Sequence, residues 1–406
     1  MSGAGSQLRD PPASVVPLLD ELRRFMDERV KPLERAVLSQ PFVESLPLLR
    51  PLREEAKRRG LWAPQMPKAW GGQGLSMLEH GFVSEVLGAV PFAHWVLNCQ
   101  APDAGNMEIL LHFGTPAQQE RFLRPLVEGA VRSCFSMTEP DRPGSNPTWL
   151  ETRARRDGSG WVIDGTKWFT SSADGAAFAV VMAVTDEDAP PHRRASMLLV
   201  PMDTPGVRLV RNISVMGHAG SDWPSHAELA YEGVRVPADA VLGEVGAGFA
   251  IAQERLGPGR IHHCMRWLGV CARAYELHVE RAATRPFAPF VPLGALQMVQ
   301  EQIALSRIEI HAARLMVLDA AHRIDAVGQK EARDEIAMIK VFVARTMQAV
   351  LDRAVQAHGA LGVTDDLPLA AFFRHERAAR IYDGPDEVHL AALARRALKA
   401  HGVKVP

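Results

Sequence analysis

A carboxylate occupies a distinctive place near the C-terminus of this 406-residue chain. Residues 374–382 are rich in helix formers, Gly384 then breaks the helix, and Pro385 suits the first position of a new one. Asp383 therefore lies at a break between two helical segments, where its side chain can face a pocket and accept a proton. A solvated loop aspartate is the competing interpretation, and this segment alone does not exclude it.

Two upstream segments combine small hydroxyl side chains with aromatic rings. They are CFSMTEPDRPGSN (134–146) and DGTKWFTSSA (164–173). Hydroxyl groups can bond the nitrogen atoms of a planar heterocycle such as a flavin, and an aromatic side chain can lie against its rings. Two ordinary strands with a polar turn are the alternative, but the two segments at this spacing favour a flavin site. The side chains concerned are Ser136, Thr138, Ser145, Trp168, Phe169, Thr170, Ser171 and Ser172.

The elements that must position these residues change along the chain. Residues 15–133 are expected to be mainly helical, with a turn at WGGQG (70–74). The segment 15–37 has apolar residues at helical spacing, with acids and arginines between them. Its apolar positions are Val16, Leu19, Leu22, Met26, Val30 and Leu33.

Residues 134–245 are expected to form a β domain, because β-branched or alternating runs are separated there by Gly, Pro and Asp turns. The pattern becomes helical again from residue 246, with long runs at 296–326 and 332–358. The expected domains are an N-terminal helical domain (1–133), a middle β domain (134–245) and a C-terminal helical domain (246–406). The expected strands are 162–163, 179–184, 196–201, 207–210 and 227–231.

Composition excludes several classes of protein. With 47% hydrophobic and 23% charged residues, the chain has the make-up of a soluble globular protein. A formal net charge of −1 gives no electrostatic case for binding nucleic acid or an anionic membrane. The sequence lacks a signal peptide and any run of roughly 18 apolar residues that could span a membrane. A cytoplasmic location is therefore expected.

The motifs of several other functions are also missing. The chain contains no GxGxxG, Walker, GxSxG or HExxH motif. His262, His263 and Cys264 are adjacent on an expected helix, where neighbours point about 100° apart, so we expect no metal site there. The four cysteines include no CxxC pair and indicate buried free thiols in a reducing compartment. They are Cys99, Cys134, Cys264 and Cys271.

With these motifs in view, the chain resembles the acyl-CoA dehydrogenase family over about residues 15–400. The resemblance rests on motifs that occur in the family's order. They are PKAWGGQGLS (67–76), FGTPAQQERFLRPLVEG (113–129), the TEP motif, YEGVRVPADAVLGEVGAGF (231–249), AVQAHGALG (354–362) and IYDGP (381–385). The forms DGPDEVH and RIHHCMRWLG (260–269) resemble one branch, which in eukaryotes is fused to a kinase-like domain of the aminoglycoside phosphotransferase type.

The resemblance implies an α+β fold with an N-terminal helical domain, a middle β-barrel or sandwich and a C-terminal four-helix bundle. It implies a FAD-dependent enzyme that desaturates an acyl-CoA between the α and β carbons and passes electrons to an electron-transferring flavoprotein. Asp383 would take the α proton while the β hydride moves to flavin N5. The family usually has Glu there, and Asp shortens the reach by roughly 1.5 Å, a displacement that can affect the rate strongly. The branch implies acyl chains that are long, branched, or substituted with a 4-hydroxyl group or its phosphate.

The resemblance also assigns binding residues. Those expected to bind FAD are Phe135, Met137, Thr138, Ser145, Phe169, Ser171, Arg285, Gln356, Gly359 and Glu387. Gln356 and Gly359 would reach the ADP end of FAD in a neighbouring subunit, which implies a homo-oligomer, a dimer or a tetramer. Those expected to bind substrate are Ser145, Arg260, Tyr382 and Gly384.

Two other functions stay open on the same fold. A flavin oxidase, of the acyl-CoA oxidase or nitroalkane oxidase kind, is one, because nitroalkane oxidases resemble this family and use an Asp as base. A non-enzymatic flavoprotein that binds DNA is the other, supported only by the basic residues near the C-terminus. Rapid reoxidation of the flavin by oxygen would favour the oxidase, and salt-sensitive DNA binding would favour the third function.

Overall fold

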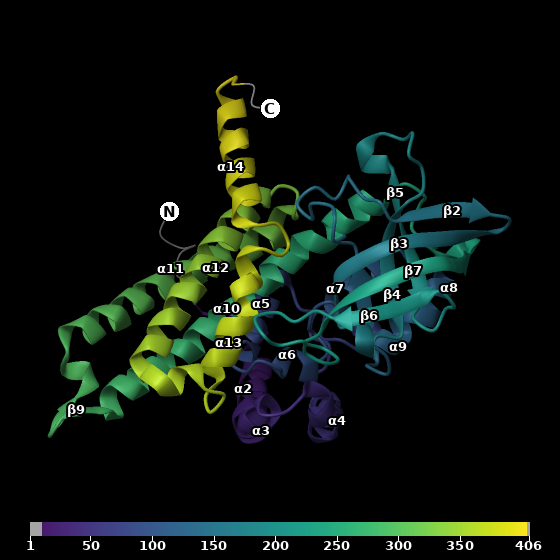
Figure 1. Ribbon diagram of the computed structural model, residues 1–406. Coiled ribbons are helices and arrows are strands. Elements are labelled where there is room, and N and C mark those ends of the chain that lie inside the picture. Colours follow the sequence, from purple (N-terminus) through teal and green to yellow (C-terminus); the bar gives the residue numbers. More distant parts are fainter. Residues whose placement is uncertain (1–9, 404–406) are drawn as a thin grey trace.

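A computed structural model describes residues 10–403 of the protein, which form two helical parts and a sheet (Figure 1). The N-terminal helices lie beneath the junction of a long helical bundle and the sheet. The three-part α+β architecture expected from the sequence is confirmed. The N-terminal helices are α2 (Val16–Phe25), α3 (Glu34–Leu38), α4 (Phe42–Arg58), α5 (Met77–Leu87), α6 (Ala93–Val96), α7 (Asp103–Phe113), α8 (Pro116–Gln118) and α9 (Arg124–Val127).

The first helical segment is less regular than its apolar spacing suggests. Helix α2 ends at Phe25, a π-helical turn follows at Met26–Val30, and a 3-10 turn at Lys31–Leu33 precedes α3. Pro32 lies in the 3-10 turn and has no N–H to donate, so the α-helical ladder cannot continue through it. Helix α5 has a more typical start, a capping box between Ser76 and Glu79.

The middle part is a sheet whose two halves share one core. The strand order is β6-β7-β3-β2-β4-β5-β8, and β1 pairs with β4. A single residue pair joins β2 to β4, and side chains from both halves pack into one hydrophobic cluster, so the halves face each other as in a sandwich. The strands are β1 (Ser133–Ser136), β2 (Arg153–Asp157), β3 (Gly160–Ser171), β4 (Phe178–Val184), β5 (Ala195–Pro201), β6 (Val207–Asn212), β7 (His226–Pro237) and β8 (Val241–Leu242).

The C-terminal part is a bundle of long helices that begins beside the sheet. Helices α10, α11 and α12 pack against one another, and α5 of the N-terminal part packs on α10 and α11. A short hairpin of β9 and β10 lies at the end of the bundle far from the sheet, and α14 projects beyond the bundle (Figure 1). The elements are α10 (Gly248–Thr284), β9 (Pro286–Ala288), β10 (Val291–Pro292), α11 (Gln297–Val327), α12 (Arg333–His358), α13 (Pro368–Glu376) and α14 (Asp386–Ala400).

Three general features of these elements bear on what the sequence indicated. All four cysteines are buried and free, as the sequence indicated. Within residues 10–403, no helix is both long enough and apolar enough to cross a membrane. The same residues contain no group of three potential ligand side chains that could hold a metal ion. His262 instead contacts Glu108, and His263 contacts Asp383.

Candidate active site

Asp383 lies in a tight turn between α13 and α14. A 3-10 turn (Arg377–Arg380) ends the first helical segment, and Asp383 then adopts a positive φ of 55° that non-glycine residues rarely take. The carbonyl oxygen of Asp383 accepts a hydrogen bond from Arg260 Nε at 2.9 Å and lies 3.2 Å from His389 Nε2. The predicted break between helices is therefore present, and Arg260 of α10 and His389 of α14 hold its unusual backbone.

The carboxylate of Asp383 is surrounded by basic groups. His263 Nε2 lies 3.3 Å from Asp383 Oδ2. Burial acts to raise the pKa of Asp383, but the hydrogen bond from His263 and the positive charges of Arg255 and Arg260 outweigh it and hold the pKa below its usual range. The carboxylate is therefore ionised at neutral pH and can accept a proton.

A buried lysine supports the same turn from below. Lys340 of α12 has no exposed surface, and its Nζ donates to the carbonyl oxygens of Ala379 at 2.7 Å and Gly384 at 3.3 Å. The ammonium also lies 5.5 Å from the Trp267 ring and 5.4 Å from the Tyr382 ring. Burial lowers the pKa of Lys340, and the negative charge of Asp383 opposes that shift. Lys340 thus fixes the backbone on both sides of Asp383.

The segment 135–138 presents its side chains alternately. Ser136 is buried and lies within hydrogen-bonding distance of Thr170 and Tyr231, whereas Phe135 and its second neighbour Met137 are partly exposed. The carbonyl oxygen of Thr138 accepts the backbone N–H of Trp168 at 3.0 Å. The two segments that the sequence singled out are therefore adjacent in space.

Arg255 connects this segment to the turn that holds Asp383. Its guanidinium lies 4.1 Å from the centre of the Phe135 ring and donates to Asn106 Oδ1 at 3.1 Å. It is also close enough to Asp383 for its charge to lower the pKa of that carboxylate. Arg255 therefore lies near both the base candidate and the aromatic segment.

Phe169 and Ser171 are set by an irregularity in β3. The register between β3 and β7 shifts between Lys167 and Thr170, and Phe169 adopts a φ of 49° with 43% of its surface exposed. A large aromatic ring exposed by a bulge suits contact with a flat ligand. Ser171 Oγ lies 2.8 Å from His226 Nδ1, and burial lowers the pKa of His226 to about 4, so this imidazole is neutral at pH 7.

A buried ion pair supports the TEP motif. Lys167 Nζ donates to Glu139 Oε1 and to the carbonyl oxygen of Met137, each at 2.8 Å, and neither Lys167 nor Glu139 is appreciably exposed. Glu139 also accepts the backbone N–H groups of Glu151 at 2.6 Å and Thr152 at 2.9 Å. The pair therefore fixes both ends of the loop 140–150, in which Ser145 is exposed.

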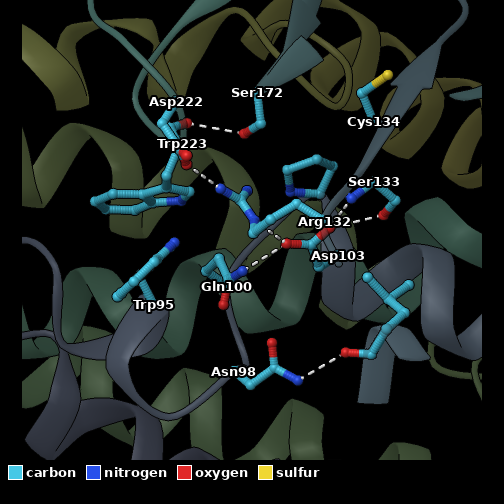
Figure 2. A network of polar contacts seen from close by, with 12 residues as sticks. Trp95, Asn98, Gln100, Asp103, Arg132, Ser133, Cys134, Ser172, Asp222 and Trp223 are labelled. Carbon is cyan, nitrogen blue, oxygen red and sulfur yellow. Dashed lines mark hydrogen bonds and ion pairs between the residues drawn. The ribbon is translucent and has the colours of Figure 1, made fainter. Parts of the chain in front are cut away.

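Strand β1 is tied to the N-terminal helices by the polar network drawn in Figure 2. Asp103 accepts the backbone N–H and the hydroxyl of Ser133, each at 2.7 Å, and Arg132 Nε at 2.6 Å. Arg132 also pairs with Asp222, in the loop before β7. Asn106 donates to Ser133 Oγ at 2.9 Å and accepts from Arg255, so the network continues to the Arg255 side chain.

The remaining expected residues fall into two places. Arg285, Gln356 and Gly359 line one surface groove of about 520 Å³ together with Arg281 and His358. This groove lies near the end of α12, roughly 24 Å along the helix from Lys340 at about 1.5 Å per residue.

The other expected residues lie at or near the Asp383 turn. Tyr382 and Gly384 flank Asp383 directly, and Glu387 is exposed in the first turn of α14. Arg260, expected on the substrate side, bonds the turn's backbone. Sequence reasoning did not assign roles to Arg255, His263, Lys340, His389, His226 or the Lys167–Glu139 pair.

Models of three domains match the chain almost from end to end. They are the N-terminal (residues 16–130), middle (134–234) and C-terminal (246–398) domains of acyl-CoA dehydrogenase. The chain belongs to the acyl-CoA dehydrogenase family. Members of this family are FAD-dependent oxidoreductases, so this chain is an enzyme of that kind.

Individual acyl-CoA dehydrogenases are similar over most of the chain. Probable acyl-CoA dehydrogenase FadE2 of Mycobacterium tuberculosis is 49% identical over 87% of this chain and 86% of its own length. Acyl-CoA dehydrogenase family member 11 of Gallus gallus is 42% identical over 93% of this chain, but the match spans only 50% of that protein. A solved structure from Mycobacterium abscessus, described as a putative acyl-CoA dehydrogenase, is 40% identical with a TM-score of 0.92, covering 97% of this chain and 100% of that one.

The site has features that fit FAD. Phe169 presents an exposed ring and Ser171 a hydroxyl, both on strand β3. Two arginines, Arg281 and Arg285, line the separate groove near the end of α12. An aromatic ring and a hydroxyl suit an isoalloxazine, whereas guanidinium groups suit a diphosphate. A structural neighbour from Mycobacterium smegmatis was solved as a glutaryl-CoA dehydrogenase in complex with FADH2, and at 24% identity it shows the fold alone.

Proposed function

We propose that this enzyme removes one hydrogen from each of the α and β carbons of an acyl-CoA thioester, with Asp383 as the base. The observation that carries the proposal is the ionised Asp383 carboxylate, held in a strained turn beside the segment 135–138. A base must be ionised before it can accept a proton, and it must be fixed close to the carbon that loses one. Asp383 meets the first condition, and the hydrogen bonds from Arg260 and Lys340 fix the turn that carries it.

The residues around the turn divide the task. Asp383 accepts the α proton on a carboxylate oxygen, while Arg260 and Lys340 hold its backbone through carbonyl groups. FAD, when bound, supplies the acceptor for the hydride that the β carbon loses. Tyr382 and Gly384 flank the base and are proposed to contact the acyl thioester, with Ser145 at the rim of the site. The side chain of Asp383 is only 18% exposed, which limits the access of water to the base.

A homo-oligomer is part of the proposal. The groove of Arg285, Gln356 and Gly359 lies far along α12 from Asp383, so we propose that it binds the ADP part of FAD held by a neighbouring subunit. Exposed apolar side chains on α11 and α14 are suited to burial between subunits. They include Met298, Leu305, Ile308, Val388, Leu390 and Leu398. FAD binding and association would then strengthen each other.

The electron acceptor is proposed to be an electron-transferring flavoprotein in the cytoplasm. One structural neighbour, at 26% identity and a TM-score of 0.82, comes from work titled for the electron transferring flavoprotein of Acidaminococcus fermentans. A flavin oxidase is the second candidate, favoured by the aspartate in place of the family's usual glutamate. Reoxidation of the reduced enzyme in air separates the two, because an oxidase releases peroxide rapidly and a dehydrogenase does not.

An anaerobic titration tests the proposed reaction. Purified FAD-loaded enzyme is mixed with acyl-CoAs that are short, long, branched, or carry a 4-hydroxyl group or its phosphate, while the flavin absorbance is followed. Bleaching by at least one thioester, with formation of the 2-enoyl product, is the expected result. An enzyme that retains FAD but is bleached by none of these thioesters would contradict the proposal.

A further inference from the structure

His263 makes a direct contact with the proposed base. Its Nε2 lies 3.3 Å from Asp383 Oδ2, and both side chains are 18% exposed. Neither Arg260 nor His389 makes such a contact, since both reach only the backbone carbonyl of Asp383. Of the basic groups around Asp383 within residues 10–403, His263 is thus the one that reaches the carboxylate itself.

The His263 ring is itself held in place. It stacks on Trp267 with ring centres 5.8 Å apart and planes at 20°, and it lies 4.8 Å from the Tyr382 ring. Trp267 is fixed in turn, because its Nε1 donates to Glu376 Oε2 at 2.8 Å and Glu376 pairs with Arg266. These contacts leave the imidazole little freedom to move away from Asp383.

The remaining freedom of Asp383 lies in its side chain. Hydrogen bonds from Arg260 and Lys340 to carbonyls fix the backbone of the turn on both sides. They do not restrain the two side-chain torsions that direct the carboxylate. A contact at Oδ2 restrains both torsions at once, and His263 supplies it.

We propose that His263 is a positioning residue that directs the Asp383 carboxylate. Burial lowers the pKa of His263, so the ring is neutral at pH 7 and donates through Nε2–H to Oδ2. The other oxygen of Asp383 is left to take the α proton. This role rests on the proposed function, because it assumes that Asp383 is the base.

The two oxygens of Asp383 then have different tasks. The imidazole donates to Oδ2, and this hydrogen bond helps to keep the carboxylate ionised. Oδ1 is left to accept the α proton. The hydrogen bond makes the carboxylate a weaker base but a better-placed one. Displacement of a reacting group by about 1 Å can cost on the order of 100-fold in rate, so placement outweighs a modest loss of basicity.

Two substitutions of His263 separate the hydrogen bond from the packing. His263→Phe keeps a flat ring between Trp267 and Tyr382 but removes the donor, whereas His263→Gln keeps an N–H donor near the position of Nε2. The rate of flavin reduction by a saturating acyl-CoA should fall about 10- to 100-fold in the Phe variant and by much less in the Gln variant. The substrate concentration that gives half the maximal rate should change little in both. Rates are taken per bound FAD, and His263→Leu replaces the Phe variant if that variant does not fold.

A double-mutant cycle with Asp383→Asn shows whether His263 acts through the base. His263→Phe should slow the residual reduction by Asp383→Asn no further. Equal rates for wild type and His263→Phe, or equally slow Phe and Gln variants, would overturn the role of His263 while leaving Asp383 as base. If Asp383→Asn alone reduces its flavin at the wild-type rate, the proposed function fails instead.

Discussion

Lys167 and Lys340 are both fully buried, and each lies beneath one half of the candidate site. Lys167 supports the flavin-side segment and is neutralised by Glu139 at 2.8 Å. Lys340 supports the Asp383 turn and binds carbonyl oxygens and aromatic faces, with no carboxylate among its hydrogen-bond partners in residues 10–403. Burial lowers the pKa of both lysines, and that of Lys167 falls to about 8 despite Glu139.

The difference suggests two kinds of support. The flavin-side segment is held by the Lys167–Glu139 ion pair, in which the two charges compensate each other whether or not a ligand is bound. The ammonium of Lys340 is compensated by dipoles, by the charge of Asp386 and by the more distant charge of Asp383. When Asp383 takes a proton, that charge disappears, so Lys340 responds electrostatically to the reaction while Lys167 does not. The rate of the reaction should therefore depend on Lys340 and the turn it supports. Retention of FAD should depend on Lys167 and the segment it supports.

The largest expected effect follows from removing the base. Asp383→Asn keeps the shape of the turn but cannot accept a proton, so flavin reduction by substrate should fall about 10²- to 10⁴-fold. FAD content should stay that of the wild type. Stopped-flow absorbance under anaerobic conditions measures the rate. Asp203→Asn, at an exposed aspartate in the loop after β5, is the matched control and should leave the rate unchanged. An Asp383→Asn enzyme that reduces its flavin at the wild-type rate would make Glu387 the next candidate for the base.

Breaking the flavin-side pair should affect stability and cofactor binding. Lys167→Met leaves the Glu139 carboxylate buried and unpaired, which should lower the free energy of unfolding by about 3–5 kcal/mol. FAD should dissociate more readily, because the segment 135–138 loses its support. Urea unfolding and the FAD-to-protein absorbance ratio measure the two effects. Replacing both partners by apolar residues, Lys167→Met with Glu139→Leu, should recover much of the stability. No recovery in the double variant would contradict this account.

Substitution of Lys340 should lower the free energy of unfolding less than substitution of Lys167 does, but it should lower activity more. Lys340→Met leaves two carbonyl oxygens without a donor but removes a buried charge that has no carboxylate partner, so we expect a loss of about 1–3 kcal/mol. Turnover should fall while FAD content is retained, the reverse of the Lys167 result. Lys330→Met, at an exposed lysine, is the control. FAD loss in Lys340→Met as large as in Lys167→Met would show that the two lysines do not differ in role.

Much of this arrangement could be predicted from the sequence. The five expected strands lie within or overlap β3, β4, β5, β6 and β7, and the runs at 296–326 and 332–358 match α11 and α12 within a residue or two. Local signals suffice there, because alternation and helical spacing act within one element. The segments 134–146 and 164–173 are also adjacent, as their hydroxyl and aromatic residues suggested.

The partners of Asp383 could not be predicted in the same way. His263 and Lys340 are distant from it in sequence, and they meet the turn only after α10 and α12 have packed against it. His389 is only six residues away, but its contact with the Asp383 carbonyl depends on the sharp turn before α14. A histidine on a helix is usually explained by core packing, and a lysine by solvent exposure. The run RIHHCMRWLG was noticed only as a resemblance, because its physical meaning depends on which side of α10 faces the turn.

The smallest expected effect compares one histidine on each side of the site. His226 bonds Ser171 on the flavin side, and His389 contacts the Asp383 carbonyl on the base side. Burial lowers the pKa of each from 6.5 to about 4, with further lowering from His375 for the first and from Arg260 and Lys340 for the second. Both imidazoles are therefore neutral in the folded protein at pH 5.5, whereas they are largely protonated in the unfolded chain.

Stability should consequently fall as the pH drops from about 6.5 towards 4, since the unfolded state binds more protons in that window. The buried His389 should contribute about 1 kcal/mol of loss for each pH unit, and the partly exposed His226 somewhat less. His389→Gln and His226→Gln should each flatten the dependence of the unfolding free energy on pH between 7 and 5, whereas His322→Gln, at an exposed histidine, should not. Only the His389 substitution should also slow flavin reduction, because it alone loosens the backbone of the base. If His226→Gln slowed reduction equally, the two sides of the site would be coupled more closely than their separate supports indicate.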